Sequence, residues 1–419
     1  MAKMSPPPGT ADIFPDEIPL WYRLENSAKQ VFSRYGYGEL RTPIFEYTEV
    51  FQRGLGDDTE VVQKEMYTFV DRGGRSLTLR PEGTAGVMRA LLNTDVMNGN
   101  EKRVFYIGPM FRGEKPAAGR RRQFHQIGVE NAGKMAPELD AENIIMLMHY
   151  LEEVGITGAK LLLNTRGGFA DRQPAEAALR NHFAPHIEQM CDDCKIRLEK
   201  NVWRILDCKV DCCQAIINDA PDATDSFSQE SKDYFKRVCE LLTAMNIDFK
   251  VDSRLVRGLD YYVHTVFEVV HPGLGAQNAI AGGGRYELFL PNTKKPVIGV
   301  GFAAGLERLM MVQEALQVPI PKPEVHTVFL VSQGSAALEF NLRQANLLRR
   351  AGVVVALEVE AKSIKAQMRA ANRVKASTVI ICGETELEQG LLVVKDMASS
   401  EQSELPVDKL LEYCLELGA

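Results

Sequence analysis

A proline-rich stretch, VPIPKPEV at residues 318–325, separates two parts of the chain that differ in their pattern of secondary structure. Before it, between residues 66 and 130, strand-like runs follow one another over short connections, which is typical of an antiparallel sheet. After it, strand-like runs alternate with helical stretches, which indicates a small parallel or mixed α/β sheet. The stretch itself favours a linker. We therefore expect an α+β domain over residues 1–322 and an α/β domain over residues 326–419.

A polar, helix-rich segment of about residues 168–250 interrupts the first domain, and we interpret it as a helical insertion. Upstream of it, residues 138–155 show the apolar spacing of an amphipathic helix. The segment LRTPIFEYTEVF, residues 40–51, is rich in β-forming residues but contains Pro43, which favours an edge strand or an extended arm. The first domain is therefore expected to combine a sheet with helices.

Composition and charge restrict the class of protein. The 419 residues carry 49 Lys and Arg against 56 Asp and Glu, so a nucleic-acid site would require a local basic patch. The first residues, MAKMSPPPGTADIF, lack the apolar stretch of a signal peptide, and no run approaches the roughly 18 apolar residues of a membrane span. The eight scattered cysteines suit a reduced protein better than a disulfide scaffold. We expect a soluble cytoplasmic protein without a membrane partner.

One short segment, FRGEKPAAGRRRQF at residues 111–124, concentrates positive charge in an acidic chain. Like charges this close repel one another unless an anion lies among them, so the loop is either solvated or a site for a polyanion. Just before the loop, Arg112 and Glu114 lie two positions apart in a strand-like run and share a face. An arginine steadied by a carboxylate can bind a phosphate, although this short motif alone favours an ion pair. The four cations of the loop are Lys115, Arg120, Arg121 and Arg122.

A glycine-rich strand followed by a helix, GVGFAAGLERLMM at residues 299–311, is a second candidate. Its small residues would let a nucleotide approach the backbone, where Arg308 could meet a phosphate. Tight packing of helix on sheet, with a surface ion pair, explains the pattern about as well.

The segment LVRGLDYYVHTVFE, residues 255–268, is a third candidate because an arginine and two adjacent tyrosines could line a polar, aromatic-walled pocket. Tyrosines are also common in ordinary strands. As a strand, the segment would place Arg257 and Tyr261 on one face and Asp260 and Tyr262 on the other.

Three shorter motifs carry polar groups. In RPEGTA, Glu82 and Thr84 stand at a turn into a helix, which Thr84 could cap. In RQFHQIGVE, Gln126 and Glu130 lie four apart and therefore on the same strand face. The three glycines of AGGGRYELF, residues 281–289, favour a hairpin bend.

In this order, the motifs resemble those of class II aminoacyl-tRNA synthetases, and specifically of the histidyl-tRNA synthetase family. YGYGELRTPIFE is similar to class II motif 1, FRGE through RQF to motif 2, and GVGFAAGLERLMM to motif 3. LVRGLDYY and GGGRYE are similar to the two signature peptides of the histidine enzymes, and the resemblance covers nearly the whole chain. It implies a class II catalytic domain with an antiparallel sheet flanked by helices, a helical insertion, an α/β anticodon-binding domain, and a homodimer.

The resemblance also implies an activity and a role for each motif residue. L-Histidine would react with ATP to give histidyl-adenylate and pyrophosphate, and would then pass to the 3′ end of tRNA(His). Arg112 would hold the α-phosphate of ATP and Arg308 the γ-phosphate, and Glu114 would also belong to the ATP site. Arg257 would balance charge during the attack, and Mg²⁺ would be bound through the ATP phosphates. The residues implied to surround histidine are Glu82, Gly83, Thr84, Gln126, Glu130, Tyr261 and Tyr262.

Basic residues in two places are implied to contact tRNA. The loop after Arg112 would reach the acceptor stem, although Ala117 leaves open which loop residue reads it. In the second domain, KSIKAQMRAANRVK at residues 362–375 places four cations near one helical face, and phosphate contact and a solvated face explain them about equally well. These cations are Lys362, Lys365, Arg369 and Arg373.

The insertion contains a Cys-x₂-Cys pair, CDDC at residues 191–194, followed by further cysteines at 208, 212 and 213. Such a set is compatible with zinc bound by four thiolates. The second half lacks a Cys-x₂-Cys pair, and free thiols are favoured. The candidate ligands are Cys191, Cys194, Cys208 and Cys212.

Two other functions fit the same fold class. One is a non-catalytic paralogue that acts as a regulatory subunit of ATP phosphoribosyltransferase, and the other is a module that senses RNA or histidine. Paralogues of the first kind generally lose the catalytic arginines and the anticodon-binding domain, and a sensor needs no ATP site. This chain keeps Arg112, Arg257 and Arg308, which favours the enzyme.

Overall fold

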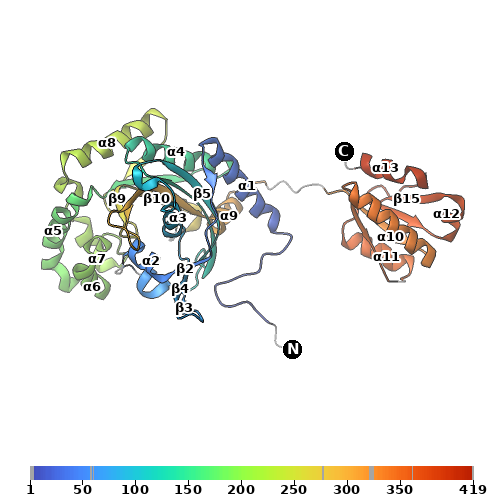
Figure 1. The fold of residues 1–419 in the computed structure, drawn as a ribbon, viewed down its shortest axis with the longest axis horizontal. Coiled ribbons are helices and arrows are strands. Elements are labelled where there is room, and N and C mark those ends of the chain that lie inside the picture. The colour runs from blue at the N-terminus through green and yellow to red at the C-terminus, as the bar shows by residue number, and fades with distance from the viewer. Residues whose placement is uncertain are drawn as a thin grey trace. The chain divides into compact units, whose positions relative to one another are not determined.

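The computed structural model describes residues 4–56, 59, 61–275, 278–319, 325–360 and 362–417. The chain divides into two compact units, the first ending at Ile320 and the second beginning at Pro321 (Figure 1). Of the predicted linker 318–325, residues 320–324 lie outside the described residues. Each unit is considered by itself below.

An eight-stranded sheet forms the centre of the first unit, in the order β1-β5-β6-β11-β10-β9-β7-β8. The six strands from β5 to β7 in this order are antiparallel neighbours, which confirms the sequence prediction, whereas β1 and β8 add to the two edges in parallel. The strands are β1 (Gly38–Glu39), β5 (Lys102–Phe111), β6 (Gln123–Ala132), β7 (Lys160–Thr165), β8 (Phe249–Val251), β9 (Tyr262–Val270), β10 (Ala279–Leu288) and β11 (Val297–Gly305).

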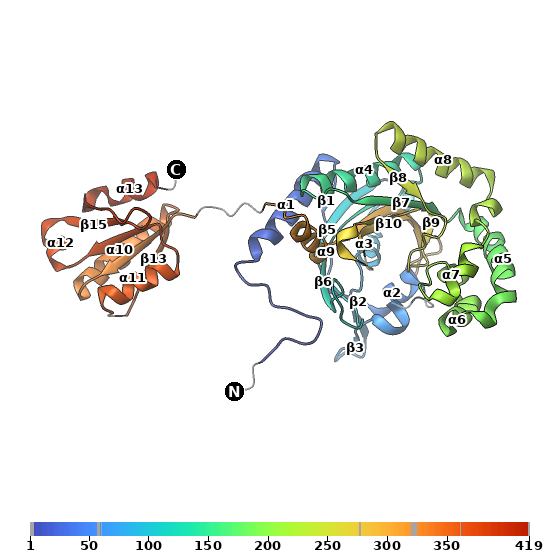
Figure 2. The same ribbon diagram turned by 180° about the vertical axis from the view of Figure 1, so that it is seen from behind.

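Helices cover the two faces of this sheet differently (Figures 1 and 2). On one face, α1 (Ile18–Arg34), α4 (Pro137–Glu153) and α9 (Leu306–Ala315) bury an apolar core with the sheet. On the other face, the shorter helices α2 (Thr48–Leu55) and α3 (Thr84–Leu91) pack beside several buried tyrosines. Because side chains alternate along a strand, residues next to core positions point to this second face. The candidate residues of β6, Gln126 and Glu130, lie there.

A small sheet of β2 (Phe45–Tyr47), β4 (Ser76–Leu79) and β3 (Thr68–Val70) lies beside the large one, in that order. The strand β2 lies at its edge, as Pro43 led us to expect. The strand-like sequence of residues 48–51 nevertheless begins α2, because Val50, Phe51 and Leu55 then share a buried helical face. Tertiary packing thus overrides local β propensity at this point.

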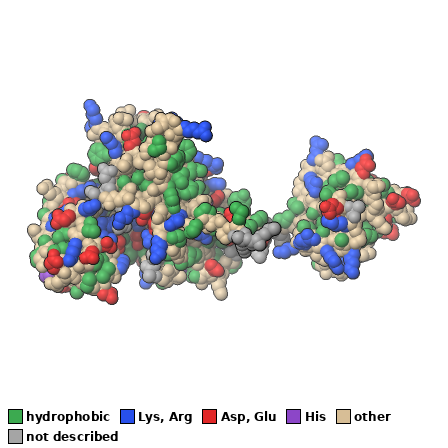
Figure 3. Space-filling view, turned by 90° about the horizontal axis from the view of Figure 1, so that it is seen from below, with side chains coloured by type: hydrophobic (Ala, Val, Ile, Leu, Met, Phe, Trp, Pro, Cys, Tyr) green, Lys and Arg blue, Asp and Glu red, His purple; other side chains and the backbone are tan. Residues whose placement is uncertain are grey.

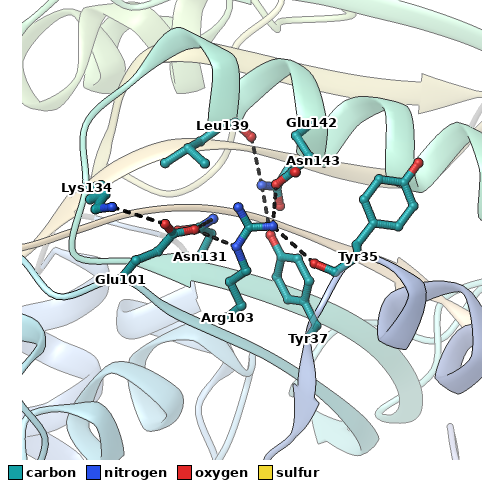
Figure 4. Close-up of polar contacts among 9 residues, drawn as sticks. All are labelled: Tyr35, Tyr37, Glu101, Arg103, Asn131, Lys134, Leu139, Glu142 and Asn143. Atoms are coloured by element: carbon teal, nitrogen blue, oxygen red, sulfur yellow. Dashed lines mark hydrogen bonds and ion pairs between the residues drawn. The ribbon is translucent and has the colours of Figure 1, made fainter.

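A polar network fastens one end of the sheet to α4 (Figure 4). Arg103 of β5 lies at its centre, 2.6 Å from Glu101 and 2.8 Å from Glu142 of α4, and it also donates to the carbonyl of Tyr35. Asn131 of β6 donates to Glu101 at 2.9 Å. The partly buried charges are therefore paired, and they connect β5, β6, α4 and the chain that leads into β1.

The insertion is helical, as predicted, and has a separate apolar core around Trp203. Its helices are α5 (Arg172–Phe183), α6 (Asp192–Lys200), α7 (Asp211–Asn218) and α8 (Gln229–Ala244), with short 3₁₀ turns between them. The last helix, α8, packs on α4 and contacts β9, and so attaches one end of the insertion to the central sheet.

The second unit has a mixed five-stranded sheet in the order β13-β12-β14-β15-β16, which confirms the α/β prediction. The first three strands are parallel to one another and the last two are antiparallel. Its elements are β12 (Thr327–Ser332), α10 (Ser335–Arg350), β13 (Val354–Leu357), α11 (Ile364–Arg373), β14 (Thr378–Cys382), α12 (Glu384–Gln389), β15 (Leu391–Asp396), β16 (Gln402–Pro406) and α13 (Leu410–Glu416). Within the described ranges, no helix of either unit combines the length and the apolar character needed to cross a membrane.

Candidate active site

A cavity of about 70 Å³, here called the inner pocket, opens on the α3 face of the large sheet. It brings together six of the seven residues predicted to surround histidine, from the start of α3 and the turn before it, from β6, and from the start of β9 and the segment before it. The seventh, Gly83, is the residue before α3 and does not line the cavity. Short residues of β10 and β11 leave room beneath it: a Cβ atom on Gly301 would lie only 2.2 Å from Glu130 Oε2. The six residues are Glu82, Thr84, Gln126, Glu130, Tyr261 and Tyr262.

Two buried carboxylates define the chemistry of the inner pocket. Glu130 accepts hydrogen bonds from Thr84 Oγ1 at 2.6 Å and from the Tyr286 hydroxyl at 2.7 Å. Burial raises the pKa of Glu130 to about 8 and also raises the pKa of Glu82. A cationic ligand would compensate for the burial of these carboxylates, so the pocket favours a positively charged guest.

The same contacts correct the prediction for Thr84. It is the first residue of α3 rather than its cap, and the Glu82 carboxylate accepts from the amides of Thr84 and Ala85 at 2.6 and 2.8 Å. A carboxylate suits this position because it satisfies the free N–H groups at the start of a helix and interacts favourably with the helix dipole.

Two tyrosines of the inner pocket, Tyr106 and Tyr286, were not among the predicted site residues. Tyr106 lies opposite Gly128 across the β5–β6 ladder, and a Cβ atom on that glycine would lie 2.4 Å from its ring. A large aromatic residue opposite a glycine is a signal that becomes readable only once the strand register is known.

The Arg257 segment differs from the strand that the sequence predicted. Strand β9 begins only at Tyr262, so the preceding residues form a loop and strict alternation does not apply. Arg257 and both tyrosines all line the inner pocket. Asp260 points elsewhere, to Asn201 Nδ2 of the insertion at 2.7 Å. The three glycines of residues 282–284 likewise lie within β10 rather than in the expected bend.

A second cavity of about 250 Å³, here called the outer pocket, adjoins the inner one. Arg112, Arg257 and Gln126 line both cavities, which places an amide and two cations at their junction. Arg257 is paired with Glu268 of β9, a partner that the sequence alone did not reveal. The other polar residues of the outer pocket include Glu114, Arg120, Arg121 and Arg308. Such a concentration of arginine suits a polyanion.

Backbone contacts hold the arginines of the outer pocket in place. Arg112 Nε donates to the carbonyl of Pro81 at 2.9 Å, and its guanidinium lies 5.3 Å from the ring centroid of Phe124. Arg308 donates from Nε to the Gly119 carbonyl at 2.9 Å and from NH1 to the Ala279 carbonyl at 2.6 Å. Burial and the neighbouring Arg120 lower the pKa of Arg308. These contacts preorganise the two guanidinium groups.

The four cations of the basic loop are not equivalent. Lys115 and Arg121 are exposed, whereas Arg120 forms an ion pair with Glu114. The Arg122 amide donates to the Gly9 carbonyl at 2.8 Å, and its side chain lies against Gly9. Arg122 therefore fastens the N-terminal segment, which leaves Lys115 and Arg121 as the freely accessible cations of the loop.

The helix α11 presents three of the four predicted cations of the second unit at exposed positions: Lys365, Arg369 and Arg373. Lys362 precedes the helix and is paired with Glu358 at 2.9 Å and Glu360 at 3.0 Å. The basic face of α11 therefore consists of the three residues spaced four apart.

Three of the four candidate thiols of the insertion, Cys191, Cys194 and Cys208, come together, but the fourth member of the group is Cys213. Cys212 is exposed. Cys212 and Cys213 are neighbours in α7, and neighbouring side chains leave a helix about 100° apart, so only Cys213 points toward the other three thiols.

Comparisons with known proteins agree with this geometry. A family model described as histidyl-tRNA synthetase matches residues 9–309, and a model described as anticodon binding domain matches residues 327–417. The histidine–tRNA ligase of Bacillus cytotoxicus is 44% identical over 415 residues, covering 98% of each chain. The histidine–tRNA ligase of Fervidobacterium nodosum is 45% identical over 399 residues, covering 94% of each chain.

A solved structure agrees as well. The apo histidyl-tRNA synthetase of S. aureus superposes with a TM-score of 0.80 at 36% identity, covering 98% of this chain and 100% of that chain. Two adjoining pockets, one acidic and one rich in arginine, thus lie within a fold and sequence shared over nearly the full length. The chain belongs to the histidyl-tRNA synthetase family.

Proposed function

We propose that the chain is a histidine–tRNA ligase: it joins L-histidine and ATP into histidyl-adenylate and pyrophosphate, then transfers histidine to the 3′ end of tRNA(His). The observation that carries this proposal is the junction of the two pockets. Arg112 and Arg257 line both the acidic inner pocket and the arginine-rich outer pocket. An amino acid in the first and a nucleotide in the second would meet at these cations.

Histidine fits the inner pocket by charge and by hydrogen bonding. Glu82 and Glu130 supply buried acceptors for its ammonium group and protonated imidazole, and Gln126 lines the same wall. In the part of the chain that the structure describes, Gln126 Oε1 is buried without a hydrogen-bond partner, so a ligand N–H would satisfy it. An aliphatic amino acid would leave these polar groups unpaired, which gives selectivity without an editing domain.

The outer pocket supplies fixed positive charge for ATP. Arg112 at the junction suits the α-phosphate. Arg308, which lines the outer pocket but not the inner one, suits the γ-phosphate. Mg²⁺ prefers oxygen ligands and enters with ATP phosphates, and the Glu114 carboxylate in the wall of this pocket could complete its shell. The ion would neutralise part of the phosphate charge.

The first reaction step then needs orientation and charge balance more than proton transfer. A carboxylate oxygen of histidine bonds to the α-phosphorus, and the bond from that phosphorus to its bridging oxygen breaks, so pyrophosphate leaves with the electron pair. No proton moves, so no general base is required. Two anionic groups must approach each other, and Arg112 and Arg257 offset their repulsion.

Exchange of pyrophosphate into ATP tests the proposal directly. Exchange that depends on histidine, with the other amino acids as controls, is the expected result. Absence of exchange in folded protein would instead favour the regulatory function. The match of an anticodon-binding model to residues 327–417 already argues for the ligase.

Contact between α11 and tRNA leads to a separate prediction. Changing Lys365, Arg369 and Arg373 together to glutamine is expected to raise KM for tRNA by about tenfold and to lower the salt dependence of binding by about one unit per lost phosphate contact. Pyrophosphate exchange should not change, because α11 lies in the other unit. Arg343→Gln on α10, an exposed arginine paired with Glu339, is the matched control. Unchanged tRNA affinity in the triple variant would contradict the assignment.

A homodimer is the second proposed association, and it is supported by exposed apolar side chains on the small sheet. Phe45, Phe69 and Val70 are 50%, 43% and 69% exposed on its two outer strands. The Phe45 and Phe69 rings lie 6.3 Å apart on one face of this sheet, whereas Val70 lies on the other face. Exposed apolar side chains gathered in this way mark interfaces.

The dimer prediction is tested with Phe69→Ser combined with Val70→Ser. This variant is expected to sediment as a monomer at concentrations where the parent is a dimer, because apolar area at the interface is lost. Val251→Ser, at a similarly exposed valine of β8, is the control and should remain dimeric. A parent chain that sediments as a monomer would exclude the proposed dimer.

A further inference from the structure

We propose that the helical insertion binds one Zn²⁺ ion through Cys191, Cys194, Cys208 and Cys213. The four sulfur atoms lie within 4.8 Å of one another, and Cys191 Sγ and Cys208 Sγ are 3.8 Å apart. A tetrahedral site with Zn–S bonds of about 2.3 Å requires sulfur atoms about 3.8 Å apart. A disulfide requires about 2.05 Å, and all eight cysteines, each within the described ranges, are free thiols. The geometry is therefore that of a tetrathiolate cage.

The backbone presents the ligands in two similar halves. Cys191 is the residue before α6 and Cys194 lies in its first turn. Cys208 lies shortly before α7 and Cys213 lies in its first turn. Thiolates at the start of a helix are stabilised by the helix dipole and by free N–H groups. One such donor is present, since the Cys191 amide donates to Cys213 Sγ at 3.3 Å.

Burial and donor chemistry identify the ion. Cys194, Cys208 and Cys213 are buried, and Cys191 is half-buried against the same core. Four thiolates in a tetrahedron select zinc or iron over hard cations such as Mg²⁺. The proposed ligase reaction transfers no electrons, so a redox-inactive ion suits a structural role. The ion would join two helices of nine and eight residues, lengths that are marginal without tertiary support.

The site has a consequence for the inner pocket. The segment between the two ligand pairs includes Asn201, which donates to Asp260 at 2.7 Å, and Trp203, whose ring lies 4.1 Å from the guanidinium of Arg166. Asp260 immediately precedes the two pocket tyrosines. Metal binding on both sides of this segment would hold one wall of the inner pocket in position. The effect on the inner pocket rests on the proposed function, whereas the proposal that the cysteines bind a metal does not.

Metal analysis of the full-length chain tests the proposal. Protein purified without chelator should contain about one zinc per chain. Cys194→Ser and Cys213→Ser should each lose most of this zinc, whereas Cys212→Ser, the adjacent exposed cysteine, should keep it. Equal loss in all three variants, iron in place of zinc, or parent protein without zinc would overturn the assignment.

A second measurement avoids the risk that a ligand variant misfolds. After chelation of the parent protein under reducing conditions, added Co²⁺ should produce the charge-transfer and d–d absorption of a tetrahedral thiolate site, and Zn²⁺ should abolish it. Hydrogen exchange at residues 201–206 should accelerate after chelation and slow again when Zn²⁺ is restored. Chelated protein that shows no Co²⁺ spectrum and no change in exchange would refute the site, and this outcome is independent of pyrophosphate exchange.

Discussion

Arg257→Ala is expected to slow histidine-dependent adenylate formation by about 10²–10³-fold, the usual cost of removing a preorganised group that stabilises transition-state charge. Arg257 lines both pockets and is oriented by its ion pair with Glu268. Its loss should affect the step in which the histidine carboxylate approaches the α-phosphate more than histidine binding. We therefore expect kcat for pyrophosphate exchange to fall while the calorimetric affinity for histidine changes little.

Two further variants separate this role from a structural one. Arg254→Ala, an exposed arginine three residues upstream, is the control and should keep the parental rate. Glu268→Gln should lower kcat by a smaller factor, because the guanidinium remains but loses its orienting partner. An Arg257→Ala variant that activates histidine at the parental rate would exclude the proposed role.

Glu130→Gln is expected to raise KM for histidine by about 10–100-fold, because a charge-assisted hydrogen bond in a buried pocket contributes about 1.5–3 kcal/mol. The amide keeps the size of the side chain and can still accept from Thr84 Oγ1, which lies 2.6 Å away. The main property removed is the ability of the side chain to ionise and so to balance the positive charge of bound histidine. Steady-state exchange at varied histidine concentration measures the effect, and an unchanged KM would place the histidine cation elsewhere.

The same substitution should increase stability in a defined pH window. Burial raises the pKa of Glu130 in the folded chain from the ordinary value of 4.5 to about 8. Between these values the unfolded chain has lost this proton while the folded chain retains it, so Glu130 makes the parent less stable as pH rises. Glu130→Gln removes this dependence. Its melting temperature should therefore rise relative to that of the parent between about pH 5 and pH 8 and remain higher above pH 8.

Opposite effects on binding and stability would identify Glu130 as a group retained for function. If Glu130 had only a structural role, changing it to Gln would make the protein less stable. Its hydrogen bonds would weaken, and no unfavourable pKa shift would be relieved. A melting-temperature difference that does not vary with pH would show that the Glu130 pKa lies near its ordinary value in the folded chain. Functional sites of natural proteins often contain groups that lower the stability of the fold but are needed for activity.

Local patterns in the sequence were sufficient for much of the fold. The antiparallel centre of the first sheet, α4, the helical insertion and the α/β second unit all follow from residue periodicity, which reflects the 3.6- and 2-residue repeats of helix and strand. Gln126 and Glu130 share a face of β6 for this reason, and both line the inner pocket. The order of the motifs along the chain led to the resemblance to histidyl-tRNA synthetases, and the match of the family model to residues 9–309 confirms it.

Other features depend on segments that are distant in sequence. Tyr286 donates to Glu130 across 156 positions, and Glu268 reaches Arg257 only because a loop precedes β9. No periodicity encodes such contacts, since they depend on strand register and on the path of a loop. The same limit led us to expect a strand across residues 255–261 and a cap at Thr84.

The charged residues and the cysteines show most clearly what can be predicted from the sequence and what cannot. The order of residues alone shows that an acidic chain contains a basic loop, a basic helix and a group of cysteines. On the face drawn in Figure 3, Lys and Arg are interspersed with Asp and Glu. The three-dimensional fold is needed to show that Arg122 packs against Gly9, that Lys362 is paired with Glu358, and that Cys213 rather than Cys212 joins the thiol cluster. This difference arises because composition and spacing specify only which groups are available. Their partners, burial and pKa values depend on where packing brings distant parts of the chain together.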